Sequence, residues 1–307
     1  MKVGYVVLYE DGELVISKNH TLLQKKIIKD YCEFEDTDVP WKNNDFYKIK
    51  KIRILDQVRT MYMSDWFKDC INLTTLINFK NLDVSDCTDF SYVFYNCNSL
   101  KTLKELENWN VSNGTDFSFM FGYCISVLNI KALQDWNVSN GTDMNSMFSG
   151  CTSLQDLNGL QNWNVSDCTD FSYMFYNCES LQDVNELRKW NVSNGEDFSY
   201  MFSNCESLQN IDALKTWNVE NGKDFSQMFS HCESLQTIDE LQTWNVGNAT
   251  YFLYMFEYCT SLQNILLPNT LSVLRKDIFY ECNTTLKIHW KNHIYTYEDL
   301  LEYQTIY

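Results

Sequence analysis

"SYMFYNCESLQDVNELRKWNVSN" at residues 172–194 is followed 27 residues later by "SYMFSNCESLQNIDALKTWNVEN" at residues 199–221. The same spacing recurs along most of the chain as columns of one residue type. These columns are Phe at 67, 94, 121, 148, 175, 202, 229 and 256, Cys at 70, 97, 124, 151, 178, 205, 232 and 259, and Trp at 109, 136, 163, 190, 217 and 244. A fixed period of this length is typical of stacked units that are too small to bury their apolar faces alone. The sequence therefore predicts a solenoid.

A single repeat, residues 170–196, predicts the elements of each coil. Four apolar residues spaced i, i+3, i+4 and i+7 predict a short helix, and Asp170 stands where it would cap the first turn: Phe171, Met174, Phe175 and Cys178. A three-residue rhythm follows and favours a short strand and an irregular return turn: Leu181, Val184, Leu187, Trp190 and Val192. The expected fold is an α/β solenoid of the leucine-rich-repeat type, with 27-residue coils of short parallel strand, turn and short helix.

Both ends of such an array need a cover. Residues 1–54 are expected to form an N-terminal cap with a hairpin turning at Asp11–Gly12, a helix over 21–34 and a lead-in strand. The repeat solenoid is expected over 55–267. Residues 268–307 should hold a final, shorter repeat and a C-terminal cap, which consists of a hairpin turning at Lys291–Asn292 and a terminal helix capped by Thr296 and Asp299.

The net charge of −17 is concentrated in the repeats. Residues 61–267 carry 9 Lys/Arg and 26 Asp/Glu, whereas residues 1–60 are almost balanced, with 11 and 10. An acidic array repels phosphate groups, so nucleic acids and anionic membranes are not expected as direct partners. Solubility alone is an equally good reason for the acidity.

The twelve cysteines have a spacing that favours free thiols over a disulfide scaffold. Eight of them recur at the same phase of successive coils, where they act as small core residues. No CxxC pair converges on one point, so no metal site is expected. These features, with no apolar export signal near residue 1 and no run of membrane-spanning length, predict a reducing, cytoplasmic location for the chain.

Known catalytic signatures are absent, including a glycine-rich phosphate loop, a GxSxG elbow and HExxH. We expect no enzyme and no cofactor. A hydrolase that uses surface carboxylates remains a distant alternative, because no pair of acids stands out among so many.

Two surfaces are candidates for binding another protein. The first is the expected strand face, whose outward positions grade from basic to acidic along the chain: Lys104, Lys131, Asp156, Asp183, Asn185, Glu186, Asp212 and Asp239. The second is a row of aromatic residues on the opposite side of each expected helix from the core: Tyr92, Phe119, Tyr173, Tyr176, Tyr200 and Tyr254. Exposed aromatic residues are enriched at interfaces, but rings in a row can also simply pack on one another.

The repeats resemble those of the BspA-like leucine-rich repeat proteins of bacteria, including the mycoplasma-type surface repeats. "NWNVSNGTDFSFMFGYC" at 108–124 is close to the family's "NWDTSNVTDMSYMFYGC", and "DVPWKNNDFYKIKKIRI" at 38–54 is similar to its lead-in segment. The resemblance covers residues 36–290. In this chain the repeat is one residue longer between strand and Trp, and Gly or Cys replaces the family's Val before Thr-Asp.

The resemblance implies a non-catalytic, protein-binding role, and the family is mostly secreted and implicated in adhesion. From the residues themselves we expect an intracellular inhibitor, immunity protein or scaffold whose acidic face binds a basic patch on its partner. The alternative is a bacterial surface adhesin that is exported or cut from a longer chain. The sequence does not identify the partner, the organism or phage of origin, or the oligomeric state.

Overall fold

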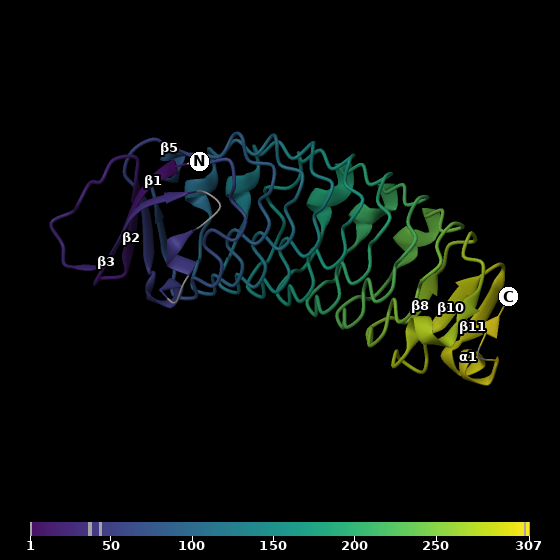
Figure 1. Cartoon of the computed structure of the whole chain (residues 1–307). Coiled ribbons are helices and arrows are strands. Elements are labelled where there is room, and N and C mark those ends of the chain that lie inside the picture. Colours follow the sequence, from purple (N-terminus) through teal and green to yellow (C-terminus); the bar gives the residue numbers. More distant parts are fainter. Residues whose placement is uncertain (1, 36–38, 43–44, 304, 307) are drawn as a thin grey trace.

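The computed structural model describes residues 2–35, 39–42, 45–303 and 305–306 and shows a gently curved stack of coils with a small sheet at each end (Figure 1). The first sheet has the strand order β3-β1-β2-β4-β6. Its strands are β1 (Lys2–Tyr9), β2 (Glu13–Ser17), β3 (Ile27–Glu35), β4 (Lys51–Ile54) and β6 (Thr75–Ile77). The strands β2, β4 and β6 run parallel, so this sheet leads directly into the stack.

The N-terminal cap contains one predicted element and lacks another. Strands β1 and β2 form the predicted hairpin at Asp11–Gly12, where Gly12 has a φ of 81°. The helix predicted over 21–34 is wrong, because Ile27–Glu35 is strand β3, antiparallel to β1. The outer edge of β1 has backbone donors and acceptors that need partners, and β3 provides them. Two short 3₁₀ helices, η1 (Pro40–Lys42) and η2 (Phe46–Lys48), lie between β3 and β4.

Each segment predicted to be a short helix is instead a pair of tight turns. Met174 donates to the carbonyl of Phe171 and Cys178 to that of Phe175, both at 3.2 Å. The third and seventh residues of the segment, Tyr173 and Asn177, have left-handed backbones with φ of 57°. Every second N–H points to the next coil, so the i→i−4 bonds of an α-helix do not form.

The predicted row of short parallel strands is also largely wrong. The positions after Val184 and its equivalents form 3₁₀ helices instead of a continuous sheet, and Asp183 pairs with Asn210 only as an isolated bridge. The parallel bridges instead follow the aspartate column 89, 116, 143, 170, 197 and 224, which ends at Tyr251. The 3₁₀ helices along the stack are η3 (Phe79–Asn81), η4 (Lys104–Leu106), η5 (Lys131–Leu133), η6 (Asn185–Lys189), η7 (Asp212–Thr216) and η8 (Asp239–Thr243). Strands β5 (Val58–Arg59) and β7 (Leu82–Asp83) pair in parallel at the start of the stack.

The core consists of stacked columns that run the length of the array. Phe148 and Phe175 have ring centroids 5.8 Å apart at an interplanar angle of 2°, and Trp163 and Trp190 stack at 6.5 Å and 1°. The Cys178 thiol is fully buried and donates to the carbonyl of Phe148 in the previous coil at 3.4 Å. The column cysteines are free and buried. The side chain of Cys32 lies outside the described residues.

A hairpin and a short helix stand near the C-terminal end of the described chain. Strands β10 (Lys287–Trp290) and β11 (His293–Thr296) form a hairpin whose turn residues, Lys291 and Asn292, have φ of 46° and 65°. The helix α1 (Tyr297–Tyr303) follows, and Thr296 and Asp299 cap it reciprocally through their side chains and backbone N–H groups. The remaining elements here are β8 (Asn264–Leu266), β9 (Leu274–Arg275), η9 (Lys276–Phe279) and β12 (Thr305–Ile306).

Candidate functional site

The charged positions predicted to lie on a strand face do lie in one row, but on 3₁₀ helices. Lys104, Lys131, Asn185, Asp212 and Asp239 are each the first residue of such a helix and are exposed. At Lys104, Asn185, Asp212 and Asp239 a side-chain oxygen two positions earlier accepts the backbone N–H of this first residue, as Asp183 does from Asn185 at 3.1 Å. These coils thus present one turn and one outward side chain at the same place.

Carboxylates collect toward the later coils of this row. We use the name acidic row for Asp156, Asp183, Glu186, Asp212, Asp239 and Glu240. Burial, with the charges of Asp183 and Asp156, raises the pKa of Glu186. Burial and the neighbouring Asp212 and Asp239 likewise raise the pKa of Glu240. The acidic row therefore holds crowded negative charge that a cation would relieve.

Glu240 is a member of the row that the sequence interpretation missed. It stands two periods after Glu186, and this spacing is the signal that could have found it. The intervening position is Ala213, which is buried. The Oε2 atoms of Glu186 and Glu240 are buried and lack a hydrogen-bond partner among the described residues.

The front of the same row is basic and hollowed. Lys104 and Lys131 line an open depression of about 510 Å³ together with Thr102, Asn129 and neighbouring residues. Among the described residues neither ammonium group has an ion-pair partner. The charge therefore changes sign along one surface.

The aromatic row is present but is not continuous. Tyr92 stacks on Phe119 at 4.7 Å, and Tyr173 stacks on Tyr200 at 4.3 Å. Tyr176 meets Tyr173 edge-on at 5.6 Å, and Tyr254 does the same with Tyr280 at 5.7 Å.

Polar residues interrupt this row at two of its positions, Ser146 and Gln227, and the amide of Gln227 donates to the Tyr200 hydroxyl at 2.5 Å. The six rings are half-buried. Burial and Tyr200 raise the pKa of Tyr173 to about 12. The rings thus pack largely on one another.

The described residues contain no group of three or more His, Cys, Asp or Glu that could hold a metal ion. The buried thiols are poor nucleophiles, since burial raises the pKa of Cys124 and Cys205 to about 12. Nor does the described part of the chain contain a helix long and apolar enough to cross a bilayer.

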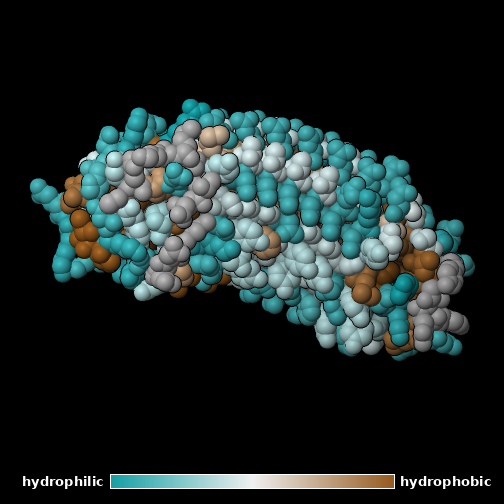
Figure 2. Space-filling view, viewed as in Figure 1, coloured by the Kyte–Doolittle hydropathy of each residue, from teal (hydrophilic) through white to brown (hydrophobic). Residues whose placement is uncertain are grey.

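On the face that Figure 2 shows, hydrophobic side chains appear mainly near the two ends of the array, and the coils between them present mostly polar groups. Near the C-terminal end, Tyr251 and Leu253 are 58% and 45% exposed. They line an open hollow of about 470 Å³ between the last full coil and the shorter final repeat. The sequence interpretation did not single out this place, although the shorter spacing of the final repeat marks it.

Solved structures that match the chain include two with low sequence identity. A leucine-rich cell surface protein from Faecalibacterium prausnitzii A2-165 is 16% identical, with 95% of each chain covered and a TM-score of 0.34. A leucine-rich repeat protein from Bacteroides ovatus ATCC 8483 is 14% identical, with 94% of this chain and 98% of that chain covered and a TM-score of 0.24. No curated protein matches the chain.

A protein family matches the repeats in five overlapping segments, residues 41–129, 61–186, 100–211, 124–237 and 184–289. Together these segments cover most of the chain, and they coincide with the stacked coils described above. They also bear out the resemblance to mycoplasma-type repeats that the Trp-Asn and Met-Phe-x-x-Cys patterns indicate. The chain belongs to the family described as "Mycoplasma protein of unknown function, DUF285".

Proposed function

We propose that this chain is a non-catalytic protein-binding repeat protein whose acidic row engages a partner that carries a basic patch. The observation that carries the proposal is the crowding of carboxylates on one face. The pKa values of Glu186 and Glu240 are raised there, so a cation placed beside them gains more than it would beside isolated acids. The change from Lys104 and Lys131 to the acidic row along one surface favours a single orientation of the partner.

We further propose that the chain works as a surface adhesin instead of as a cytoplasmic inhibitor or scaffold. The BspA-like repeats that it resembles imply adhesion. The cysteine content, which had favoured a reducing compartment, no longer argues against a surface location. The column thiols are buried, hydrogen-bonded to backbone carbonyls and of raised pKa, so they resist oxidation in either compartment.

The binding test uses the full chain as bait in an extract of the organism that produces it. Captured proteins are identified by mass spectrometry at low and at high salt. The variant combines Asp183→Asn with Asp212→Lys. Asn at 183 keeps an acceptor for the N–H of Asn185, and Asp212 is exposed. We expect capture that falls with salt and falls at least tenfold in the variant.

The matched control combines Asp167→Asn with Glu220→Lys, which makes the same change of charge at exposed positions in the turns after the tryptophans. It should capture the partner as the parent chain does. Equal losses in both variants would mean that only net charge matters. If the pair Tyr173→Ala and Tyr200→Ala abolishes capture while the acidic-row variant does not, the aromatic row is the interface.

The location test is separate. Antibody against the chain should label intact host cells, and protease added outside should remove the signal. Labelling only after the cells are permeabilised would support the intracellular inhibitor or scaffold.

A further inference from the structure

Neighbouring coils are joined by a regular ladder of backbone hydrogen bonds. The N–H groups of Phe171 and Tyr173 donate to the carbonyls of Asp197 and Ser199 in the next coil, both at 2.9 Å. The carbonyl of Thr169 accepts the N–H of Glu196 at 2.8 Å. Acceptor and donors thus stand at positions i, i+2 and i+4, and the next coil satisfies all three.

The ladder of backbone hydrogen bonds is interrupted between the last 27-residue coil and the shorter final repeat. The equivalent groups there are the carbonyl of Thr250 and the N–H groups of Phe252 and Tyr254, which have no hydrogen-bond partner among the described residues. The pairing resumes further along, where Phe256 donates to Ile278 at 2.8 Å and Tyr258 to Tyr280 at 3.0 Å. The cause lies in the final repeat, where Cys282 follows Cys259 by 23 residues instead of 27.

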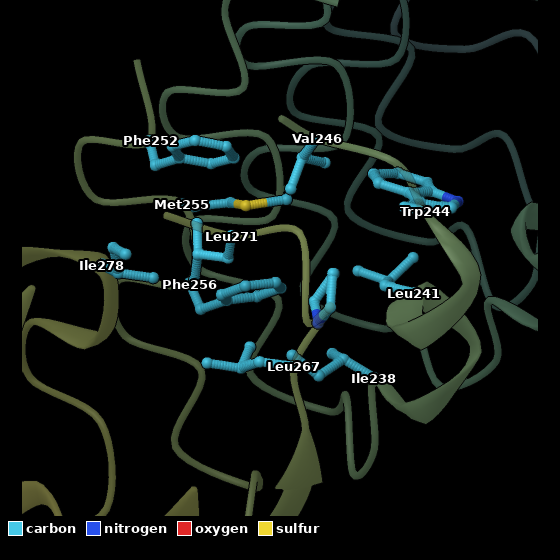
Figure 3. Close-up of a pocket in the computed structure, with 11 residues that line it drawn as sticks. Ile238, Leu241, Trp244, Val246, Phe252, Met255, Phe256, Leu267, Leu271 and Ile278 are labelled. Carbon is cyan, nitrogen blue, oxygen red and sulfur yellow. The ribbon is translucent and has the colours of Figure 1, made fainter. Parts of the chain in front are cut away.

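The aromatic columns end at the same place. Trp217 stacks on Trp244 at 6.4 Å and Phe225 on Phe252 at 5.6 Å, and neither column continues with an aromatic residue. One period after Trp244 the chain has Leu271. A small apolar cavity of about 20 Å³ remains among these side chains, with Trp244, Phe252 and Leu271 in its wall (Figure 3).

The apolar cavity adjoins the open hollow, whose lining includes Thr250 and Phe252, two of the three residues with unpaired backbone groups. Phe252, Leu271 and Ile278 line both. On its outer side the hollow is bordered by exposed Tyr251 and Leu253. Unpaired backbone N–H and C=O groups, spaced as in a strand, therefore lie beside an apolar opening. No aromatic side chain of the final repeat fills that opening.

We propose that this boundary is a binding site for an extended peptide segment of another protein that carries an aromatic side chain. The peptide continues the ladder. Two of its carbonyls accept the N–H groups of Phe252 and Tyr254, and one of its N–H groups donates to the carbonyl of Thr250. Its aromatic ring stacks on Phe252 over the apolar cavity, as Phe198 stacks on Phe171 at 5.5 Å within the array.

The groups around the opening favour a peptide that carries an aromatic side chain. Alternating backbone donors and acceptors are complemented by a peptide backbone, as in the addition of a strand to an open sheet edge. The stacked columns show which side chain a closed boundary receives at this position, namely Phe at 90, 117, 171, 198, 225 and 252, with Met144 as the exception in this column. The proposal does not depend on the acidic row, so either one can fail without the other.

The test uses the full chain and a synthetic peptide, acetylated and amidated, that copies residues 195–200, "GEDFSY". This segment makes the equivalent contacts inside the array. We expect saturable binding by calorimetry, and amide hydrogen exchange at Phe252 and Tyr254 that slows at least tenfold with bound peptide. Phe225 and Gln227, the same positions one coil earlier, are already bonded to the next coil and should change little.

Two altered peptides and one pair of variants decide the mode of binding. Methylation of the glutamate nitrogen removes the donor to Thr250, and replacement of the phenylalanine by alanine removes the ring; each should weaken binding at least tenfold. Leu253→Gln should weaken it severalfold. Leu128→Gln alters a side chain that is 52% exposed elsewhere, so it should have no effect. No saturable binding, unchanged exchange at Phe252 and Tyr254, or equal affinity for the altered peptides would overturn the proposal.

Discussion

The indole Nε1 of Trp190 donates a hydrogen bond to the main-chain oxygen of Leu160 at 2.9 Å, thirty residues earlier. The same bond joins Trp163 to Leu133 and Trp217 to Leu187. The tryptophan column therefore does more than fill the core. Each indole ties its coil to the coil before it and gives a second donor to a buried carbonyl that already accepts a backbone N–H, as the Leu160 carbonyl does from Trp163 at 3.1 Å.

Trp190→Phe should destabilise the array by about 1–3 kcal/mol, because the Leu160 carbonyl loses one of its two donors and the smaller ring leaves space in the core. Urea unfolding followed by circular dichroism measures the change. Lys189→Ala, at the exposed neighbouring position, is the control and should stay within about 0.5 kcal/mol of the parent. Equal stability of Trp190→Phe and the parent would show that water or another group satisfies this carbonyl.

The column cysteines should react with a thiol reagent only after unfolding. They are fully buried, and burial raises the pKa of Cys151 and Cys178 well above the ordinary value, so few are thiolates in the native chain. Labelling without reductant, counted by mass spectrometry before and after guanidinium, measures this. Many labelled sites in the native protein, or none in the denatured one, would contradict the free thiol column.

The repeat period and the core columns could be predicted because identical spacing places identical residues at one phase of every coil. The two hairpins were also predictable, because Gly12 and Asn292, with φ of 81° and 65°, are residue types that accept a left-handed backbone in a tight turn. The capping pair Thr296 and Asp299 likewise identified α1. In each of these cases the deciding interactions are local in sequence.

The turns in place of helices could not be predicted from one repeat. The spacing of Phe171, Met174, Phe175 and Cys178 fits a helix and fits two tight turns equally well. What decides is the neighbouring coil, whose carbonyls take every second N–H and hold Tyr173 in a left-handed backbone. The charged row was predicted on strands, and its 3₁₀ backbone depends on the same packing between coils.

Alanine substitutions at Gly4 and Gly195 should show whether a new Cβ is tolerated better against a side chain than against the backbone. A Cβ at Gly4 would lie 2.2 Å from the backbone oxygen of Ser17, which strand pairing between β1 and β2 holds in place. A Cβ at Gly195 would lie 2.4 Å from the end of the Phe198 ring, a side chain that can turn, and Cys168 already occupies the equivalent position in the previous coil.

Gly4→Ala should therefore cost more than about 2 kcal/mol of stability or prevent folding, and Gly195→Ala about 1 kcal/mol or less. The melting temperature and the urea midpoint measure both. A larger loss for Gly195→Ala would show that the aromatic stack is more rigid than the strand pair.

Glu186→Gln should raise stability near neutral pH and leave it unchanged in acid. Burial and the charges of Asp183 and Asp156 raise the pKa of Glu186 in the folded chain above the unfolded value of about 4.3. The folded state therefore binds this proton more tightly. The stabilisation is complete below the unfolded pKa and is lost as pH rises through the raised folded pKa. Glutamine keeps the shape without the charge, so the variant avoids that loss.

Urea midpoints at pH ~4 and pH ~7 measure the difference, with exposed Glu206→Gln as the control. If Glu186→Gln raises the midpoint equally at both pH values, ionisation of Glu186 is not the cause, and the crowding of the acidic row would have to be explained by packing alone.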